Sequence, residues 1–327
     1  MINKLSTFLE CSRVFSLPMT ILSWLVVFTY SAIHSGNIWY GILCLLGICL
    51  VHLGTNVLDD YFDYKSLIRQ VDFDKKEYLK NTQKTKCRYL IAGLLNETQI
   101  LELAGVYFFI AGLIGLFFCI KCGTPVLKFM IAGGIIAVLY SILSKIRLSE
   151  IAVALAYGPI LFGGVNFVMT KTISWEVFIL SIPTMIMTVI LLYIHTVMDF
   201  EYDIKEGHYT VANAFDSQLD SLTVLKIFII LAYASLFGIC IFDISDWQIL
   251  LALLTIPLSV DLYQSMKEYS IDNNSVPAHK WFHHPMENMA QIEKLQAESF
   301  MIRMYQSRNL MIYFSLFIAL GLSLANL

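Results

Sequence analysis

Two clusters of oxygen-bearing side chains stand at the ends of long apolar segments. In the first cluster an asparagine and three aspartates are spaced three, four and seven residues apart, so they share one face of a helix. In the second, Asp199 and Asp203 face together while Glu201 points away. Carboxylates packed side by side repel each other unless a cation lies between them. The predicted metal ligands are Asn56, Asp59, Asp60, Asp63, Asp199 and Asp203.

Magnesium is the cation that suits such clusters. It prefers hard oxygen ligands, keeps several waters and is usually completed by a substrate phosphate. Two clusters that face each other would hold a diphosphate through bridging Mg2+ ions. Two other interpretations are solvated helix ends near the lipid headgroups and a cation transporter. A transporter would coordinate ions near mid-membrane on interrupted helices, whereas both clusters end their segments, so the spacing favours a diphosphate site.

The elements that carry these clusters are membrane helices. Of the 327 residues, 57% are hydrophobic and only 14% are charged, and the mean hydropathy is +0.69. Soluble domains carry about 25% charged residues, and each apolar run is long enough to cross a hydrocarbon layer of about 30 Å. We expect an all-α, polytopic membrane protein with about nine transmembrane helices, at 16–34, 38–58, 99–120, 125–144, 150–170, 174–197, 222–242, 247–266 and 307–326.

The distribution of lysine and arginine predicts the orientation in the membrane. Most of these residues lie in or near the three longest connections, at 61–98, 199–221 and 267–306, and the opposite connections hold few. By the positive-inside rule these three loops and the active site face the cytoplasm. We therefore expect one transmembrane domain over 1–327, in the inner membrane if the source is bacterial, surrounded by lipid and without a nucleic-acid partner.

A faint internal repeat indicates how the helices are grouped. His52, Asn56 and Asp60 recur at intervals of four, and the second cluster repeats this pattern from His195. The two sets lie four spans apart, which predicts two four-helix halves plus one extra helix around a central cavity. His52 itself has two interpretations: it orients a ligand one turn away, or it is a satisfied polar group within its own helix.

Several segments together resemble the UbiA superfamily of intramembrane prenyltransferases. The two acidic motifs carry most of the resemblance, and they are closest to the branch that prenylates 1,4-dihydroxy-2-naphthoate in menaquinone synthesis. The other matches follow in the expected order along the chain. The matching segments are Arg13 with Ser16-Leu-Pro18, Asp59-Asp60-Tyr-Phe-Asp63-Tyr-Lys65, Arg88 to Gly93, Tyr140 to Lys145, Leu148-Ser-Glu150, Gly158-Pro159, Asp199-Phe-Glu201-Tyr-Asp203, Gly207 and Thr210.

Three positions depart from the pattern of that branch. Asp59 stands where the first motif usually begins with asparagine, and the D-D-x-x-D that results is similar to the motif of soluble prenyl synthases and terpene cyclases. The further aspartate that normally follows is out of register, so Asp72 or Asp74 would supply it from the loop. His195-Thr196 and Met198 stand where the naphthoate branch often has an asparagine pair and an arginine, near the acceptor.

The clusters and the resemblance together imply an enzyme. The expected reaction is Mg2+-dependent transfer of a polyprenyl group from a prenyl diphosphate to a small aromatic acceptor, 1,4-dihydroxy-2-naphthoate or a related quinone precursor. Cationic side chains hold the leaving group, and tyrosine rings stabilise the allylic cation. The expected catalytic residues are Lys145, Arg13 and Tyr140, and the expected substrate-binding residues are Arg88, Arg147, Lys84, His195, Tyr61 and Tyr157.

Three alternative functions remain open on the sequence. An intramembrane terpene cyclase would use the same magnesium site but quench the cation internally, and Asp59 favours it. A lipid-ether prenyltransferase would add the prenyl chain to a hydroxyl group. A cation-coupled transporter would use the carboxylates without any chemistry on a prenyl diphosphate.

Overall fold

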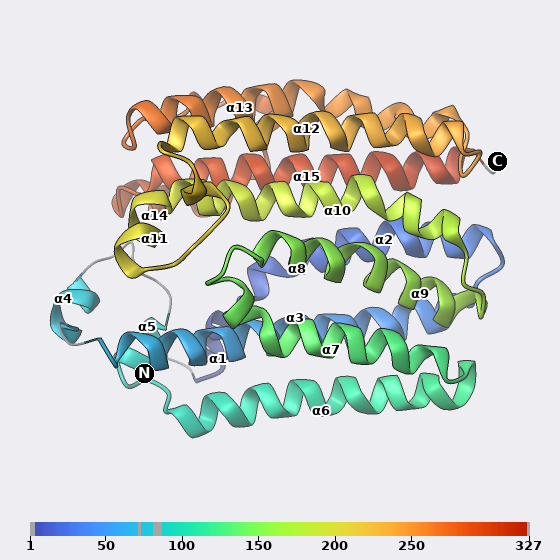
Figure 1. The fold of residues 1–327 in the computed structure, drawn as a ribbon, viewed down its shortest axis with the longest axis horizontal. Helices are drawn as coiled ribbons and strands as arrows, with labels where there is room; N and C mark the ends of the chain where they lie inside the picture. Colours follow the sequence, from blue (N-terminus) through green and yellow to red (C-terminus); the bar gives the residue numbers. More distant parts are fainter. Residues whose placement is uncertain (1–3, 71–72, 81–86, 326–327) are drawn as a thin grey trace.

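The computed structural model describes residues 4–70, 73–80 and 87–325. Across these residues the chain is helical, without a strand, and nine helical segments are long and apolar enough to cross a membrane (Figure 1). This confirms the all-α, nine-span prediction. The nine segments are Val14–Ile33, Ile38–Leu67, Glu97–Cys122, Pro125–Leu143, Ser149–Thr170, Trp175–Met198, Gln218–Ile241, Trp247–Ile271 and Glu298–Leu324.

Some of these segments contain more than one helical element. The first consists of the 3₁₀ turn η1 (Val14–Ser16) and α2 (Leu17–Ile33). The fifth and eighth are also composite. The remaining elements of the nine segments are α3 (Ile38–Leu67), α6 (Glu97–Cys122), α7 (Pro125–Leu143), α8 (Ser149–Leu155), η2 (Ala156–Ile160), α9 (Leu161–Thr170), α10 (Trp175–Met198), α12 (Gln218–Ile241), η4 (Trp247–Thr255), α13 (Ile256–Ile271) and α15 (Glu298–Leu324).

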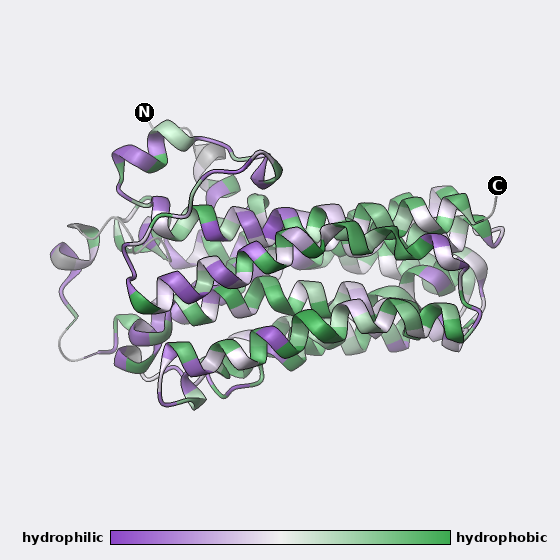
Figure 2. Ribbon diagram, turned by 90° about the horizontal axis from the view of Figure 1, so that it is seen from above, coloured by the Kyte–Doolittle hydropathy of each residue, from purple (hydrophilic) through white to green (hydrophobic). Residues whose placement is uncertain are grey.

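Short helices gather at one end of the bundle, on the left of Figure 1, where the long connections also lie. Hydrophilic residues are concentrated at the same end (Figure 2). This polar end carries both acidic motifs, and its location on the cytoplasmic side stays a prediction. The short elements of the chain are α1 (Lys4–Cys11), α4 (Lys75–Lys80), α5 (Arg88–Ile91), α11 (Phe200–Glu206), η3 (Ala212–Ala214), η5 (Trp281–His283) and α14 (Met289–Lys294).

Helix boundaries are the main difference from the sequence analysis. The second span was expected to end at residue 58, but α3 continues to Leu67, so the first part of the expected 61–98 loop is helical. The last span was expected to begin at residue 307, but α15 begins at Glu298. Apolar periodicity marks only the part of a helix within the hydrocarbon, so polar helix ends outside it are missed. Asp63 therefore stands on a continuous helix.

Small residues let α3 pack closely on α6. Gly47 lies opposite Ile114, and a Cβ atom added to Gly54 would be 3.2 Å from the Phe108 ring. Small residues at such contacts allow close approach of membrane helices. The packing sets the rotation of α3 and thereby the direction in which its acidic face points.

The internal repeat predicts two four-helix halves, and α9 of the fifth span packs on α2, α3 and α7 of the first half, so the division into halves stays a prediction. Helices α2, α3, α6 and α7 are neighbours in the first half, and α10 contacts both α8 and α12, which packs on α13. The ninth, α15, packs against α2, η4 and α10 and so joins the two groups. Its buried face contributes Phe314 to the largest apolar core. The central cavity stays a prediction.

Candidate active site

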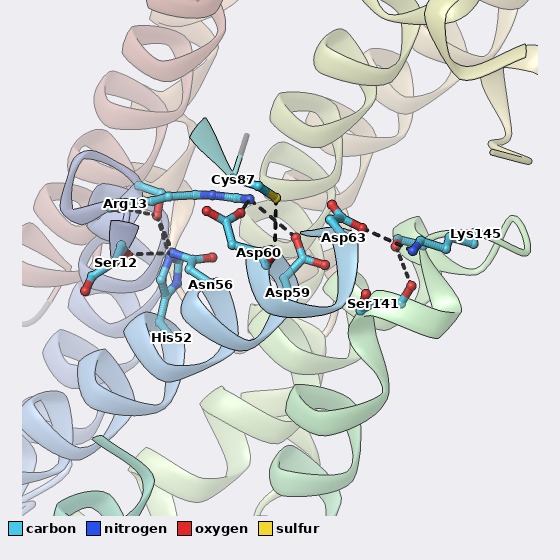
Figure 3. Close-up of polar contacts among 12 residues, drawn as sticks. Ser12, Arg13, His52, Asn56, Asp59, Asp60, Asp63, Cys87, Ser141 and Lys145 are labelled. Carbon is cyan, nitrogen blue, oxygen red and sulfur yellow. Dashed lines mark hydrogen bonds and ion pairs between the residues drawn. The ribbon is translucent and has the colours of Figure 1, made fainter. Parts of the chain in front are cut away.

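The first acidic motif lies on α3 against two cationic side chains (Figure 3). Asp59 and Asp60 have side chains only 6% and 4% exposed, and Arg13 forms an ion pair with both, with Nη2 at 3.5 Å from Asp59 Oδ2. On the other side, Lys145 Nζ lies 3.2 Å from Asp63 Oδ1. The motif is thus flanked by two of the three residues predicted to be catalytic, which are far from it in the sequence.

A tight turn between α1 and η1 places Arg13. Its backbone is left-handed, with φ 51° and ψ 50°, and its N–H donates to the Glu10 carbonyl at 2.9 Å. Burial alone would lower the pKa of Arg13, but the charges of Asp60 and Asp59 raise it above its usual value. The guanidinium is therefore a permanent charge at the motif.

Tyr89 is a further partner of the first motif that the sequence analysis missed. Its hydroxyl donates to Asp60 Oδ2 at 2.8 Å, and Cys87 Sγ donates to the Asp60 carbonyl at 3.1 Å. Burial and the charge of Asp60 raise the pKa of Tyr89, so the hydroxyl remains a donor. Tyr89 lies in the segment Arg88 to Gly93 that resembles the family, where only Arg88 is predicted to bind substrate. Arg88 donates to the Leu79 carbonyl at 2.6 Å.

The second acidic motif occupies a break between two helices. Helix α10 ends at Met198 and α11 begins at Phe200, so Asp199 lies between them. Its Oδ2 is 3.1 Å from His195 Nδ1. The Asp203 N–H donates to the Asp199 carbonyl at 2.8 Å, so the backbone keeps a helical turn between the two residues, and their shared face stays a prediction.

His208 is another residue that the sequence analysis missed. Its Nδ1 lies 3.8 Å from Asp203 Oδ1, and its backbone N–H donates to the Asp203 carbonyl at 2.8 Å. The signal in the sequence was the Gly207 turn, which brings the chain back towards the motif with a positive φ of 70°.

The turn that follows α7 links the two motifs. Lys145 reaches Asp63 with its side chain, and its backbone carbonyl accepts from the Tyr209 N–H at 3.4 Å. Arg147 donates its backbone N–H to the Tyr209 carbonyl at 2.8 Å, and its guanidinium carbon lies 5.7 Å from the Tyr209 ring centre. Because Tyr209 follows His208, the turn contacts the first motif directly and the second through the chain.

The predicted aromatic residues lie in three different settings. Tyr61 packs edge-on against Phe62 and lies 5.9 Å below Lys65 Nζ. Tyr157 Oη is 2.5 Å from His52 Nδ1. Tyr140 is half-buried on the last turns of α7, close to Lys145 in the chain.

Two of the other predicted positions fall outside the residues that the structure describes. These are Lys84 and Asp72, one of the two candidates for the missing aspartate of the first motif. The other candidate, Asp74, is exposed and accepts from the Lys76 backbone N–H at 2.7 Å. Asp74 thus directly precedes α4 (Lys75–Lys80).

The donor set fits magnesium completed by a ligand. Among the residues described, no three His, Cys, Asp or Glu side chains form a group able to hold a metal ion. Mg2+ is usually held by one or two carboxylates with waters and substrate phosphates, so the protein need not supply a full set. The carboxylates on α3 and at the α10–α11 break are hard oxygen donors of that kind.

Comparison with known structures shows a shared fold. One structure, of a digeranylgeranylglyceryl phosphate synthase, is 15% identical, covers 99% of this chain and 98% of its own, and has a TM-score of 0.59. A UbiA homologue from Archaeoglobus fulgidus bound to GPP and Mg2+ is 13% identical, with 93% and 99% coverage and a TM-score of 0.59. An apo UbiA homologue from Aeropyrum pernix K1 is 14% identical, with 94% and 98% coverage and a TM-score of 0.54.

Comparison with protein families gives a match over most of the chain. Residues 17–285 match the UbiA prenyltransferase family, whereas comparison with curated proteins gives no match. The matched range includes both acidic motifs, Tyr89 and Lys145, and Arg13 lies just before it. The chain, a multi-pass membrane protein with its acidic motifs at one polar end, therefore belongs to the UbiA prenyltransferase family of enzymes.

Proposed function

We propose that this enzyme transfers a polyprenyl group from an allylic prenyl diphosphate to a small aromatic acceptor, 1,4-dihydroxy-2-naphthoate or a related quinone precursor. The observation that carries the proposal is the contact of Arg13 and Lys145 with the carboxylates of the first motif. Fixed cations and metal-binding carboxylates at one place suit a diphosphate leaving group. The second motif resembles that of the naphthoate branch and supports the aromatic acceptor.

Magnesium would be held by Asn56, Asp59, Asp60 and Asp63 on one side and by Asp199 and Asp203 on the other. When bound, it neutralises the charge that develops on the diphosphate as the carbon–oxygen bond breaks. Arg13 and Lys145 act on the same charge from the protein side. The electron pair of the broken bond stays on the diphosphate oxygen, and these two cations stabilise it most in the transition state.

Aromatic side chains would hold the allylic carbon that remains. Tyr61, Tyr140 and Tyr157 offer ring faces, each worth about 0.5–2 kcal/mol to a cation. The acceptor ring then forms the new carbon–carbon bond and loses a proton. Arg88, Arg147 and His195 are the proposed contacts to the diphosphate or the acceptor, and the positive-inside rule supports a site that faces the cytoplasm.

One observation favours a second candidate function. The digeranylgeranylglyceryl phosphate synthase shares the fold over 99% of this chain, and the name of its product describes prenyl groups on glyceryl phosphate. An enzyme of that kind would transfer the prenyl group to a lipid hydroxyl, with the same diphosphate site and a different acceptor.

The test is a transfer assay in nanodiscs with Mg2+ and radiolabelled farnesyl or geranylgeranyl diphosphate. Parallel reactions contain 1,4-dihydroxy-2-naphthoate, geranylgeranylglyceryl phosphate or no acceptor, with wild type beside Asp60→Ala and Asp199→Ala. A prenylated naphthoate that requires Mg2+ and both aspartates is the expected result.

Other outcomes each identify a different function. A product formed only from the glyceryl phosphate establishes the lipid-ether enzyme. Hydrocarbon or alcohol with released diphosphate and no acceptor requirement indicates a cyclase. No turnover of either donor with any acceptor contradicts prenyl transfer as proposed, and ion flux in liposomes would then support a transporter.

A further inference from the structure

His52 is contacted by polar side chains from two other parts of the bundle. It lies on α3 one turn before Asn56, beneath the acidic motif (Figure 3). Its Nε2 is 2.6 Å from Ser16 Oγ, and its Nδ1 is 2.8 Å from Thr20 Oγ1 and 2.5 Å from Tyr157 Oη. These partners come from η1, α2 and η2, so His52 is not a polar group satisfied within its own helix.

The hydrogen bonds of Ser16 decide which groups in this cluster donate and which accept. Ser16 Oγ has one hydrogen, which it donates to the Arg13 carbonyl at 2.7 Å. It must therefore accept from its other two neighbours, Asn56 Nδ2 at 3.1 Å and His52 Nε2. A neutral imidazole donates through one nitrogen and accepts through the other. This assigns the proton of His52 to Nε2 and leaves Nδ1 to accept from Tyr157 or Thr20.

Asn56 is oriented by the same hydroxyl group of Ser16. Its Nδ2 donates to the Ser12 carbonyl and to Ser16 Oγ, both at 3.1 Å. Both amide hydrogens are thereby used, so the amide is locked and Oδ1 is the atom left to serve a cation. An unsupported amide would rotate and present either nitrogen or oxygen. Ser16 therefore controls which end of Asn56 faces the motif, and His52 occupies the remaining acceptor position of Ser16.

A break in the fifth span brings Tyr157 to His52. Gly158, with φ −95° and ψ −110°, and Pro159 interrupt the helix between α8 and α9 within the π segment η2. Such single-turn π segments occur often at functional sites. A Cβ atom on Gly158 would lie 2.7 Å from Met185 Sδ, so the break is packed against α10. The packed backbone at this break therefore holds the Tyr157 hydroxyl next to His52.

We propose that His52, supported by Tyr157 and acting through Ser16, is a positioning residue that orients Asn56 Oδ1 for the magnesium diphosphate and holds the Arg13 turn. This inference rests on the proposed function. It explains the hydrogen bond between Tyr157 and His52 as the contact that holds the imidazole in place. The ring of Tyr157 faces the allylic carbon in that proposal, while its hydroxyl serves the cluster. Hydrogen-bond partners of metal ligands typically change metal affinity or activity by about 10–100-fold when removed.

The test measures Mg2+-dependent binding of farnesyl S-thiolodiphosphate, an analogue that does not ionise readily, to the full-length protein in nanodiscs. We expect His52→Leu and Ser16→Ala to raise the Mg2+ concentration for half-maximal binding about 10–100-fold. His52→Gln, whose amide nitrogen can still donate to Ser16, should recover most of this loss. Tyr157→Phe, which keeps the ring, should give a smaller shift in the same direction.

Thr55→Val is the matched control, because Thr55 precedes Asn56 on α3 and its hydroxyl donates to Val51 within the same helix at 2.8 Å. It should bind the analogue as wild type does. Monodisperse elution and thermal unfolding verify that each variant is folded, and Ser16→Ala carries the test if His52→Leu does not fold. An unchanged Mg2+ requirement in folded His52→Leu or Ser16→Ala, or failure of His52→Gln to recover, overturns the proposal.

Failure of the proposed function gives a different result. The binding experiment contains no acceptor, so it reports on His52 even if wild type prenylates neither naphthoate nor glyceryl phosphate. Conversely, wild type could transfer the prenyl group to naphthoate while His52→Leu binds the analogue with a normal Mg2+ requirement. That result would support the proposed function and contradict this inference.

Discussion

The two acidic motifs have similar residues but different surroundings. The first lies within the continuous helix α3, where the side chains of Asp59 and Asp60 are 6% and 4% exposed and contact Arg13. The second lies at the break between α10 and α11, where the side chain of Asp199 is 32% exposed and pairs with His195. Arginine is charged at all relevant pH values, whereas histidine is charged only when protonated.

This difference suggests a division of labour. A buried carboxylate with a permanent partner is held in one place, because separating the pair would leave an unpaired charge away from water. Asp199, which is only half-buried and pairs with histidine, is less constrained, since partly exposed pairs contribute little stability. Asp203 of the same motif has a side chain that is only 11% exposed. We infer that the first motif is a preformed anchor and that Asp199 of the second motif completes the site when the diphosphate binds.

The largest effect is expected from Asp60→Asn. This change keeps the shape of the side chain but removes the charge that faces Arg13. Breaking a buried pair costs about 3–5 kcal/mol of stability, and we expect activity to fall about 10³-fold. Thermal unfolding and transfer rates in nanodiscs measure the two losses.

Asp199→Asn is the counterpart, with a comparable loss of activity but a loss of less than about 1 kcal/mol of stability. Equal destabilisation by both changes would contradict the division of labour.

Arg13→Gln should be nearly as severe for catalysis. The guanidinium is the cation that contacts both Asp59 and Asp60, and loss of one group that stabilises transition-state charge costs about 10²–10³-fold in kcat. Arg13→Lys should restore the charge but not the planar guanidinium, and so recover only part of the rate. Full activity of Arg13→Gln at saturating donor would show that Arg13 serves folding alone.

Lys145→Met should reduce kcat about 100-fold. The side chain contacts Asp63, and the backbone of the same residue contacts Tyr209 beside the second motif. Because the substitution removes only the side chain, the link between the motifs through the backbone stays in place. Lys128→Met is the matched control, since Lys128 is an exposed lysine near the start of α7. A loss of similar size in both variants would remove Lys145 from the mechanism.

The smallest effect is expected from Tyr89→Phe, which removes one hydrogen bond to Asp60. A hydrogen bond to a charged group is worth about 1.5–3 kcal/mol, which corresponds to roughly a 10–100-fold loss of activity. Burial and the Asp60 charge raise the pKa of Tyr89, so its hydroxyl remains protonated on the alkaline side. The ratio of wild-type to variant activity should therefore be the same at pH 7 and pH 9. A ratio that approaches one at pH 9 would mean that Tyr89 ionises there.

The sequence alone was sufficient for the number and approximate positions of the membrane helices and for the acidic residues, although not for the polar ends of α3 and α15. Apolar segments of membrane length are local features, and the spacing of Asn56, Asp59, Asp60 and Asp63 along one helix is local as well. Their side chains share a face wherever that helix lies, because helical periodicity depends only on neighbouring residues. The family motifs extended this to Arg13 and Lys145 as candidates, without saying which carboxylate each one contacts.

Only the tertiary structure decided the partners. Arg13 meets Asp60 across 47 positions in sequence, Tyr89 reaches it across 29, and Tyr157 reaches His52 across 105. Such contacts depend on the rotation and height at which each helix packs, which small residues such as Gly54 and the break at Gly158 control. Membrane spans all read as similarly apolar, so the sequence pattern contains little information on that rotation. The helices, their acidic faces and the candidate cations Arg13 and Lys145 were therefore predictable, and the contacts that join each cation and hydroxyl group to a particular partner were not.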